Sequence, residues 1–247
     1  MFFAGALGGA MNAVAGGGSF IGFPALLFTG VAPVEANATN TLALWVGAAV
    51  SGGAYRSRLK ISARILAPLL LTSLAGGLVG ALLLIKTPAQ TFLRLIPWLM
   101  LAATLLFTFG RLLTGRFAGG VSHESSNQAV AAASLFELLV ALYGGYFGGG
   151  IGIMNLAMLT TLGMTDIHEM NALKLVLGTV INGIAAVTFI VTGAVVWPSA
   201  LIMIAGAACG GYTVAHYAQK LPPPFVRATV IVIGTIMTAY FFVKAYR

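Results

Sequence analysis

Eight long apolar stretches, separated only by short polar or proline-bearing segments, make up almost all of this chain of 247 residues. They cover residues 2–28, 35–55, 62–85, 91–113, 129–162, 168–191, 196–218 and 225–244. Most contain about 20 to 24 residues, enough for a helix to cross roughly 30 Å of hydrocarbon. Charged residues make up only 7% of the chain, and its mean hydropathy is +0.99. The sequence therefore predicts an all-α integral membrane protein, folded as a polytopic helix bundle.

Glycine interrupts two of these stretches, the first and the fifth. The interrupting residues are Gly16, Gly17, Gly18, Gly148, Gly149 and Gly150. Glycine costs a helix roughly 1 kcal/mol relative to alanine, so each triplet predicts a break in the helix. In lipid, an unpaired backbone group is tolerated only where protein or a polar cavity satisfies it. We therefore expect both triplets to be non-helical and to face a shared cavity near the membrane midplane.

The chain also repeats itself. When the second half is laid on the first, the motif EMNA at 169–172 falls on EANA at 35–38, and in the same register KLP at 220–222 falls on KTP at 86–88. A slightly shorter shift superimposes the two glycine triplets, and a small indel after each triplet accounts for the difference. Several matches in the same order predict an internal duplication.

The duplication predicts two membrane repeats, residues 1–113 and 129–247, joined by a linker over 114–128. Matched interruptions in duplicated halves are typical of secondary transporters, whose substrate site lies between the repeats. Positive charge leaves parallel and inverted repeats both open, because either arrangement puts roughly twice as many basic residues inside as outside. Two features favour inversion. The basic segment 55–64 matches the uncharged segment 191–200, and the fifth stretch is long enough for a re-entrant hairpin.

The net charge of +8 does not indicate a nucleic-acid partner, because the basic residues lie at loop ends without a soluble domain to present them. A basic cluster in one short loop, which we place in the cytoplasm, consists of Arg56, Arg58, Lys60 and Arg64. Arg111 and Arg116 then fall on the same side. The single cysteine, Cys209, excludes an intrachain disulfide and a cysteine-rich metal site, and we expect neither a metal nor another cofactor. A homodimer is compatible with the sequence.

Polar residues follow each interruption on one helical face. In the second half they are Asn171, Lys174, Gly178 and Asn182, at spacings of 3, 4 and 4. In the first half they are Asn37, Asn40 and Thr41, and Asn40 corresponds to Lys174. Amides and one ammonium supply hydrogen-bond donors that suit a small oxyanion, as does the positive end of a half-helix starting after the glycines. The alternative is that Lys174 extends to the lipid headgroups while the asparagines bridge helices.

Five further polar residues lie in or beside the apolar stretches. Asn12 and Asn155 flank the interruptions, and either line the cavity or cap the broken helices. Glu137 lies about eight residues into the fifth stretch, where a carboxylate is a candidate proton carrier unless the crossing starts late and the side chain reaches the interface. Glu35 and Glu169 sit at helix starts, where a carboxylate complements the helix dipole, so we interpret them as caps.

Small residues at helical spacing predict close helix packing at two further places. Gly76 and Gly80 are four residues apart in one stretch, and Gly206 and Gly210 are four apart in another. Such pairs let two backbones approach closely and are common in membrane bundles. We expect them to contribute to packing rather than to the substrate site.

The residues around both interruptions resemble the TauE/SafE family of membrane transporters, often called sulfite exporters. The segments that carry the resemblance are FPALLFTGVAPVEANATNTLAL and FGGGIGIMNLAMLTTLGMTDIHEMNALKLVLG, and it covers nearly the whole chain. It implies export of sulfite, sulfoacetate or related small anions across the plasma membrane. It also implies that the interruptions and the helices after them, with Asn37, Asn40, Thr41, Asn171 and Lys174, form the site. Pro24 has no counterpart in the second half, so the halves need not bind symmetrically.

A secondary transporter is thus the function that the sequence predicts. An anion channel is the main alternative, since broken helices can also line a pore. A membrane-embedded enzyme is a third class, but the sequence contains no HExxH, GxSxG or P-loop motif, and its three histidines fall in different segments. We therefore expect that the protein is not an enzyme.

Overall fold

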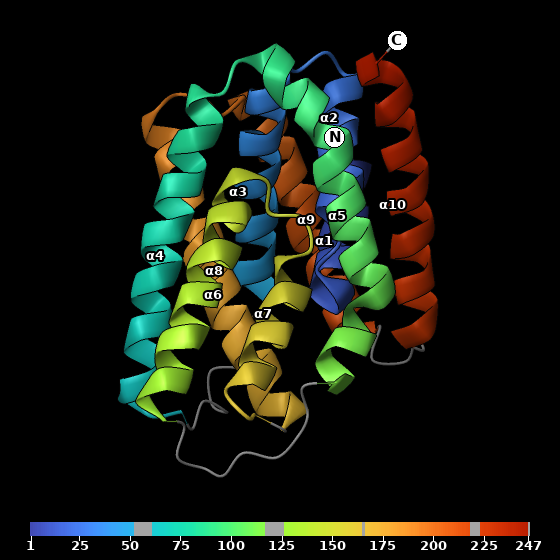
Figure 1. The fold of residues 1–247 in the computed structure, drawn as a ribbon. Coiled ribbons are helices and arrows are strands. Elements are labelled where there is room, and N and C mark those ends of the chain that lie inside the picture. Colours follow the sequence, from blue (N-terminus) through green and yellow to red (C-terminus); the bar gives the residue numbers. More distant parts are fainter. Residues whose placement is uncertain (52–60, 117–125, 165, 218–222, 247) are drawn as a thin grey trace.

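The computed structural model describes residues 1–51, 61–116, 126–164, 166–217 and 223–246. Within these residues the chain forms α-helices and no strand, which confirms the predicted all-α class. The helices are α1 (Phe2–Ala15), α2 (Ser19–Phe28), α3 (Pro33–Ser51), α4 (Ala63–Lys86), α5 (Ala89–Arg116), α6 (Asn127–Tyr146), α7 (Ile151–Thr161), α8 (Ile167–Val191), α9 (Trp197–Tyr217) and α10 (Pro223–Tyr246). They stand side by side as an upright bundle (Figure 1).

The length and composition of the helices fit a membrane protein with several crossings. Among the described residues, five helical segments are long and apolar enough to cross a bilayer. They are Ala63–Lys86, Ala89–Phe109, Asn127–Tyr146, Glu169–Val191 and Ala228–Tyr246. Large apolar side chains such as Leu71 and Leu201 stay more than half exposed on the bundle surface, as expected for side chains that face lipid. The prediction of a multi-pass membrane protein is confirmed.

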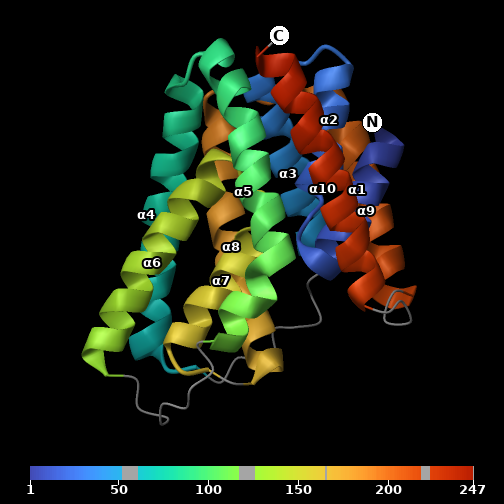
Figure 2. The same ribbon diagram turned by 45° about the vertical axis from the view of Figure 1, so that its right-hand side comes forward.

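The first and fifth apolar stretches each form two helices, and the chain reverses between them. In Figures 1 and 2, α6 rises from the lower end of the bundle and α7 runs back towards that end. The first stretch reverses as well. Gly18, which follows α1, lies next to Gly8 in the middle of α1, since a methyl group added at Gly8 would be 3.2 Å from the carbonyl oxygen of Gly18. We call residues 16–18 the first glycine turn and residues 147–150 the second glycine turn.

Glycine makes both turns possible because the backbone there is left-handed. Gly16 has φ +77°, and its N–H donates to the carbonyl oxygens of Met11 and Asn12, which ends α1. Gly150 has φ +81° and immediately precedes α7. Other L-amino acids pay a steric cost in this conformation, so glycine at these two positions allows the helix to stop and the chain to turn back.

The two hairpins start from opposite ends of the bundle. α3 begins at the upper end in Figure 1, after the first hairpin, whereas α8 begins at the lower end, after the second. Arg64 at the start of α4 and Arg116 at the end of α5 both lie at the lower end, as the charge pattern predicts. The rest of that basic cluster, Arg56, Arg58 and Lys60, lies outside the described residues. α5 runs to Arg116 and α6 begins at Asn127, so both reach slightly into the range 114–128 expected for the linker.

Two seams of small residues hold the hairpins to other parts of the chain. α6 packs against α4, where Gly76 and Gly80 lie directly on the backbone of Leu138 and Leu142. α1 packs against α9, where Gly206 and Gly210 lie on the backbone of Phe2 and Ala6. The prediction that these glycine pairs mediate close packing is confirmed. Each hairpin is therefore fixed by a helix from the other half of the chain.

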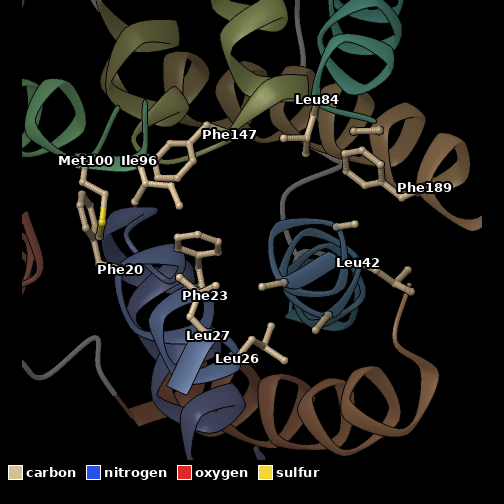
Figure 3. Close-up of a cluster of buried hydrophobic side chains, with 14 of the residues drawn as sticks. Phe20, Phe23, Leu26, Leu27, Leu42, Leu84, Ile96, Met100, Phe147 and Phe189 are labelled. Atoms are coloured by element: carbon tan, nitrogen blue, oxygen red, sulfur yellow. The ribbon is translucent and has the colours of Figure 1, made fainter. Parts of the chain in front are cut away.

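An aromatic cluster fills the centre of the bundle beside the turns. Phe23 of α2 is fully buried, and its ring lies 6.3 Å from that of Phe92, 6.0 Å from that of Phe147 and 6.1 Å from that of Phe241. Figure 3 shows Phe23 pointing towards Phe147, the first residue of the second glycine turn. A single apolar core thus joins α2, α5 and α10 to the second turn.

The α4–α6 seam generates a stability prediction. A methyl group at Gly145 of α6 would collide with the carbonyl oxygen of Gly77, so Gly145→Ala should lower the free energy of unfolding by about 1–3 kcal/mol. Gly178→Ala on α8 is the matched control, because the nearest atom to its added methyl group is 4.0 Å away. Thermal unfolding in detergent should show a lower midpoint for the first variant only. Equal midpoints would mean that the seam tolerates separation of the two helices.

Candidate functional site

The two glycine turns approach the same side chain, Phe107 of α5. A methyl group at Gly17 would lie 3.5 Å from Phe107 Cζ, and one at Gly150 would lie 3.6 Å from Phe107 Cε2. Phe107 is almost fully buried, and its ring also contacts that of Phe20, in an edge-to-face arrangement at 5.8 Å. The turns belong to different halves of the sequence, and both lie beside the Phe107 ring in the interior of the bundle.

Each turn leads into a short helix whose N-terminus lacks a side-chain cap. α2 starts after Gly18 and α7 after Gly150, and neither start has a hydrogen bond from a capping side chain. The first amide groups of a helix have no intrahelical acceptor and carry the positive end of the helix dipole. Two such ends in the interior form a region that favours a negatively charged ligand.

Two asparagines of α3 connect that helix to both turns. The Asn37 amide donates to the carbonyl oxygen of Tyr146, the last residue before the second turn, at 3.1 Å. The Asn40 amide donates to Ser19 Oγ, on the first residue after the first turn, at 3.2 Å. Both asparagines are buried, at 1% and 0% exposure, and within the described part of the chain the Oδ1 atom of each has no hydrogen-bond partner. α3 therefore touches both turns with side chains only one helical turn apart.

α8 lies along the second turn and carries the predicted cation. Lys174 is half-buried, and its Nζ donates to Asn171 Oδ1 at 3.0 Å. Its side chain runs past the start of α7, since a methyl group at Gly152 would lie 3.4 Å from Lys174 Cδ. Further along α8, Asn182 Oδ1 would lie 3.6 Å from a methyl group at Gly148. Asn182 thus borders the second turn, Lys174 borders the first residues of α7, and Asn171 bonds to Lys174.

Three further predicted residues are Asn155, Asn12 and Thr41. Asn155 on α7 is fully buried, and neither polar atom of its amide has a hydrogen-bond partner among the described residues. Asn12 lies in the last turn of α1, where its Cβ would be 3.0 Å from a methyl group at Gly18 and its carbonyl accepts the Gly16 N–H. Thr41 is buried on α3, next to Asn40. Unpaired buried amides are costly, so Asn155 is a strong candidate to contact a ligand.

Glu137 lies apart from the turns, in the α4–α6 seam. Its side chain is fully buried, and its Oε1 accepts a hydrogen bond from Ser73 Oγ at 2.6 Å. The carboxylate is therefore enclosed between helices and is not exposed on the surface of the bundle. Among the described residues, no group of three or more His, Cys, Asp or Glu side chains could hold a metal ion.

Sequence reasoning missed three residues that shape this site, Ser19, Phe107 and Tyr146, and it also missed Ser73, which bonds to Glu137 in the seam. Ser19 follows the first triplet directly, so its position offered a signal as the first residue of a half-helix. Phe107 stands among many apolar residues of its helix and had none. Tyr146 contributes its backbone carbonyl, which no side-chain pattern can indicate.

Comparisons with known protein sequences identify the family. A sequence model of the family described as "Sulfite exporter TauE/SafE" matches residues 1–241. A "Probable membrane transporter protein" of Haemophilus influenzae is 31% identical, over 97% of this chain and 92% of its own length. The "Probable membrane transporter protein YfcA" of Escherichia coli is 27% identical, over 97% of this chain and 87% of its own. No solved structure matches the chain.

The hydrogen bond from Asn37 to the second turn generates a prediction. Asn37→Ala leaves the Tyr146 carbonyl without its donor, which should cost about 1–3 kcal/mol of local stability. Hydrogen exchange followed by mass spectrometry should show faster exchange in the peptide that covers residues 147–153. The control is Thr39→Val, which removes the acceptor of the Val196 N–H and should instead loosen the start of α9. Unchanged exchange at 147–153 in Asn37→Ala would show that the turn is held without α3.

Proposed function

The chain belongs to the sulfite exporter TauE/SafE family of membrane transporters, and from this premise we propose that it is a secondary transporter of small oxyanions. The substrates that we propose are sulfite, sulfoacetate and related sulfonates, exported across the plasma membrane. The observation that carries the proposal is that α3 bonds to residues that flank both glycine turns, through Asn37 to Tyr146 and through Asn40 to Ser19. It makes one unit of two interrupted segments that are far apart in sequence, as a binding site between repeats requires.

The chemistry around the turns supports an anionic substrate. The uncapped starts of α2 and α7 supply backbone N–H groups and the positive ends of two helix dipoles. Lys174 beside α7 supplies one cation, and the buried amide of Asn155 supplies donors that no described residue accepts. A compact anion with several oxygen atoms can accept from all three kinds of donor. We assign the substrate to this region.

The arrangement of the helices supports two inverted repeats, α1–α5 and α6–α10. When the two halves of the sequence are aligned, α1 corresponds to α6 and α4 to α9, and the packing of α1 on α9 is matched by the packing of α6 on α4. Even single contacts correspond, because Gly76 lies on Leu138 and Gly210 on Ala6. After the first hairpin, α3 begins at the upper end of the bundle, and after the second hairpin, α8 begins at the lower end (Figure 1). Opposite starting ends are the relation expected for inverted repeats.

Close packing around the turns favours a transporter over a channel. Phe20, Phe107 and Phe147 are almost fully buried between and beside the two turns. A channel needs a continuous polar pore, whereas a transporter closes its site during each cycle. The packing around Phe107 is that of a closed conformation, from which the halves must move relative to each other to admit substrate.

Transport assays in proteoliposomes test the proposal directly. Purified protein should catalyse saturable flux of sulfite or sulfoacetate, and an excess of unlabelled sulfite on the opposite side should accelerate that flux by exchange. Carboxylates of similar size and empty liposomes are the controls. A flux that rises linearly with concentration and shows no exchange would indicate a channel, and no flux of any tested anion would refute the proposed substrate class.

Lys174 provides the sharpest test of the site. Loss of a charge-assisted hydrogen bond costs about 1.5–3 kcal/mol, so Lys174→Ala should weaken sulfite binding by roughly 10-fold to 100-fold. Lys174→Arg should not restore it, because a planar guanidinium differs from an ammonium in size and geometry. Calorimetry in detergent measures the affinity, and Lys86→Ala, at the end of α4, is the matched control. If Lys174 only extends to the headgroups, all three variants should bind within about twofold of wild type.

A further inference from the structure

The two small-residue seams of the bundle differ in one pair of positions. In the α4–α6 seam, Glu137 faces Ser73. When the two glycine triplets are aligned, Gly5 in the α1–α9 seam corresponds to Glu137. When the EANA and EMNA motifs are aligned, Ala207 in that seam corresponds to Ser73. That seam packs closely with these small side chains alone, since Gly5 lies on the backbone of Met203. The helix packing therefore does not require a carboxyl group, and its presence in one seam calls for another role.

The surroundings of Glu137 define where a proton can bind. Oε1 accepts the hydroxyl hydrogen of Ser73, while Oε2 is buried and has no hydrogen-bond partner among the described residues. Ser134 lies one helical turn before Glu137, and its Oγ is also buried and unpartnered. An unpaired carboxylate in a membrane interior is strongly disfavoured, whereas a neutral carboxylic acid is tolerated there.

We propose that Glu137 is the proton-binding site that couples anion transport to the proton gradient, with the exchangeable proton on Oε2. This inference rests on the proposed transport function. In the closed conformation the O–H bond is intact and the side chain is neutral. When the seam opens to water, the proton leaves to bulk solvent and the carboxylate remains, held by Ser73 until a proton returns.

Other charged groups near α6 lie towards the ends of the helices that pack against it. On α4, Arg64 and Lys86 are nine and thirteen residues from Ser73, or about 13 and 20 Å along the helix. On α8, Glu169 lies in the first turn, and Lys174 bonds to Asn171. α7 contains no ionisable side chain in its sequence, and α6 itself adds Tyr143 and Tyr146. No cation among these groups is positioned by a hydrogen bond to neutralise the Glu137 carboxylate, so a proton is the expected partner.

Helix α6 provides the physical connection between the proton and the substrate. Glu137 lies nine residues before Tyr146, at the end of α6, and the carbonyl of Tyr146 accepts the hydrogen bond from Asn37. A change of charge in the seam alters the contact of α6 with α4. Because α6 ends at the second glycine turn, such a change reaches the anion site through one rigid element, as coupling requires.

The experiment compares wild type, Glu137→Gln and the control Glu35→Gln in the full-length protein. Glu137→Gln keeps the shape but cannot release a proton, so proton-gradient-driven accumulation of sulfite should fall at least tenfold. Sulfite binding and sulfite–sulfite exchange should stay within about twofold of wild type. The control Glu35→Gln, in the first turn of α3, should keep accumulation, binding and exchange within about twofold of wild type.

Three transport results would overturn the proposal, two from Glu137→Gln and one from wild type. One is accumulation by Glu137→Gln within twofold of wild type, and the other is loss of binding and exchange together with accumulation, which would make the residue structural. Accumulation by wild type that follows a sodium gradient instead of a proton gradient would equally exclude a proton site.

A spectroscopic measurement tests the site independently of transport. Infrared difference spectra should show the C=O stretch of a protonated carboxylic acid in wild type, and Glu137→Gln should lack it. In Ser73→Ala the band should persist to higher pH, because the carboxylate loses the hydroxyl that stabilises its charge. If no anion is transported but this band is present and pH-dependent, the proposed function fails while the proton site stands. An absent band refutes the proton site even if Glu137→Gln does not fold.

Discussion

The structure depends on how it satisfies two chain reversals inside a membrane. Each glycine turn leaves backbone groups without helical partners, and lipid offers none. At the second turn the protein meets this demand with α3, whose Asn37 donates to the carbonyl of Tyr146, while Asn40 ties α3 to the side chain of Ser19 beside the first turn. Both amides lie on the helix that connects the two uncapped helix starts. The helix that ties the turns together therefore also carries polar groups that can recognise a ligand.

The small-residue seams explain why the two turns can meet. Because Gly76 and Gly80 let α4 lie directly on α6, and Gly206 and Gly210 let α9 lie on α1, each hairpin is anchored by a helix from the other half. Because each hairpin is anchored by the opposite half, both turns lie in the same interior region of the bundle, beside Phe107. Relative movement of the halves must then shear these seams, which makes them the natural place for a coupling group.

The sequence predicted the class of the fold and much of the candidate site, for physical reasons that can be traced. Hydropathy and helix length fixed the membrane class, and the spacing of Gly76 and Gly80 predicted close packing. The polar face of α3 was visible because Asn37 and Asn40 are unusual in an apolar helix. The sequence could not show that Asn37 bonds to a backbone carbonyl 109 residues away, or that Phe107 lies between the turns, since both depend on how the halves pack.

In the two repeats that we propose, the departures from symmetry are the positions where the halves acquire different roles. Asn40 bonds to Ser19 in the first half, while its counterpart Lys174 carries a charge beside α7. Glu137 occupies one seam, and Gly5 occupies the corresponding place in the other. Lys174 borders the short helix that follows the second turn, and Glu137 lies on the helix that leads into it. In the transport cycle that we propose, substrate charge and proton occupancy therefore bias the same hairpin, which is the physical requirement for linking one binding event to the other.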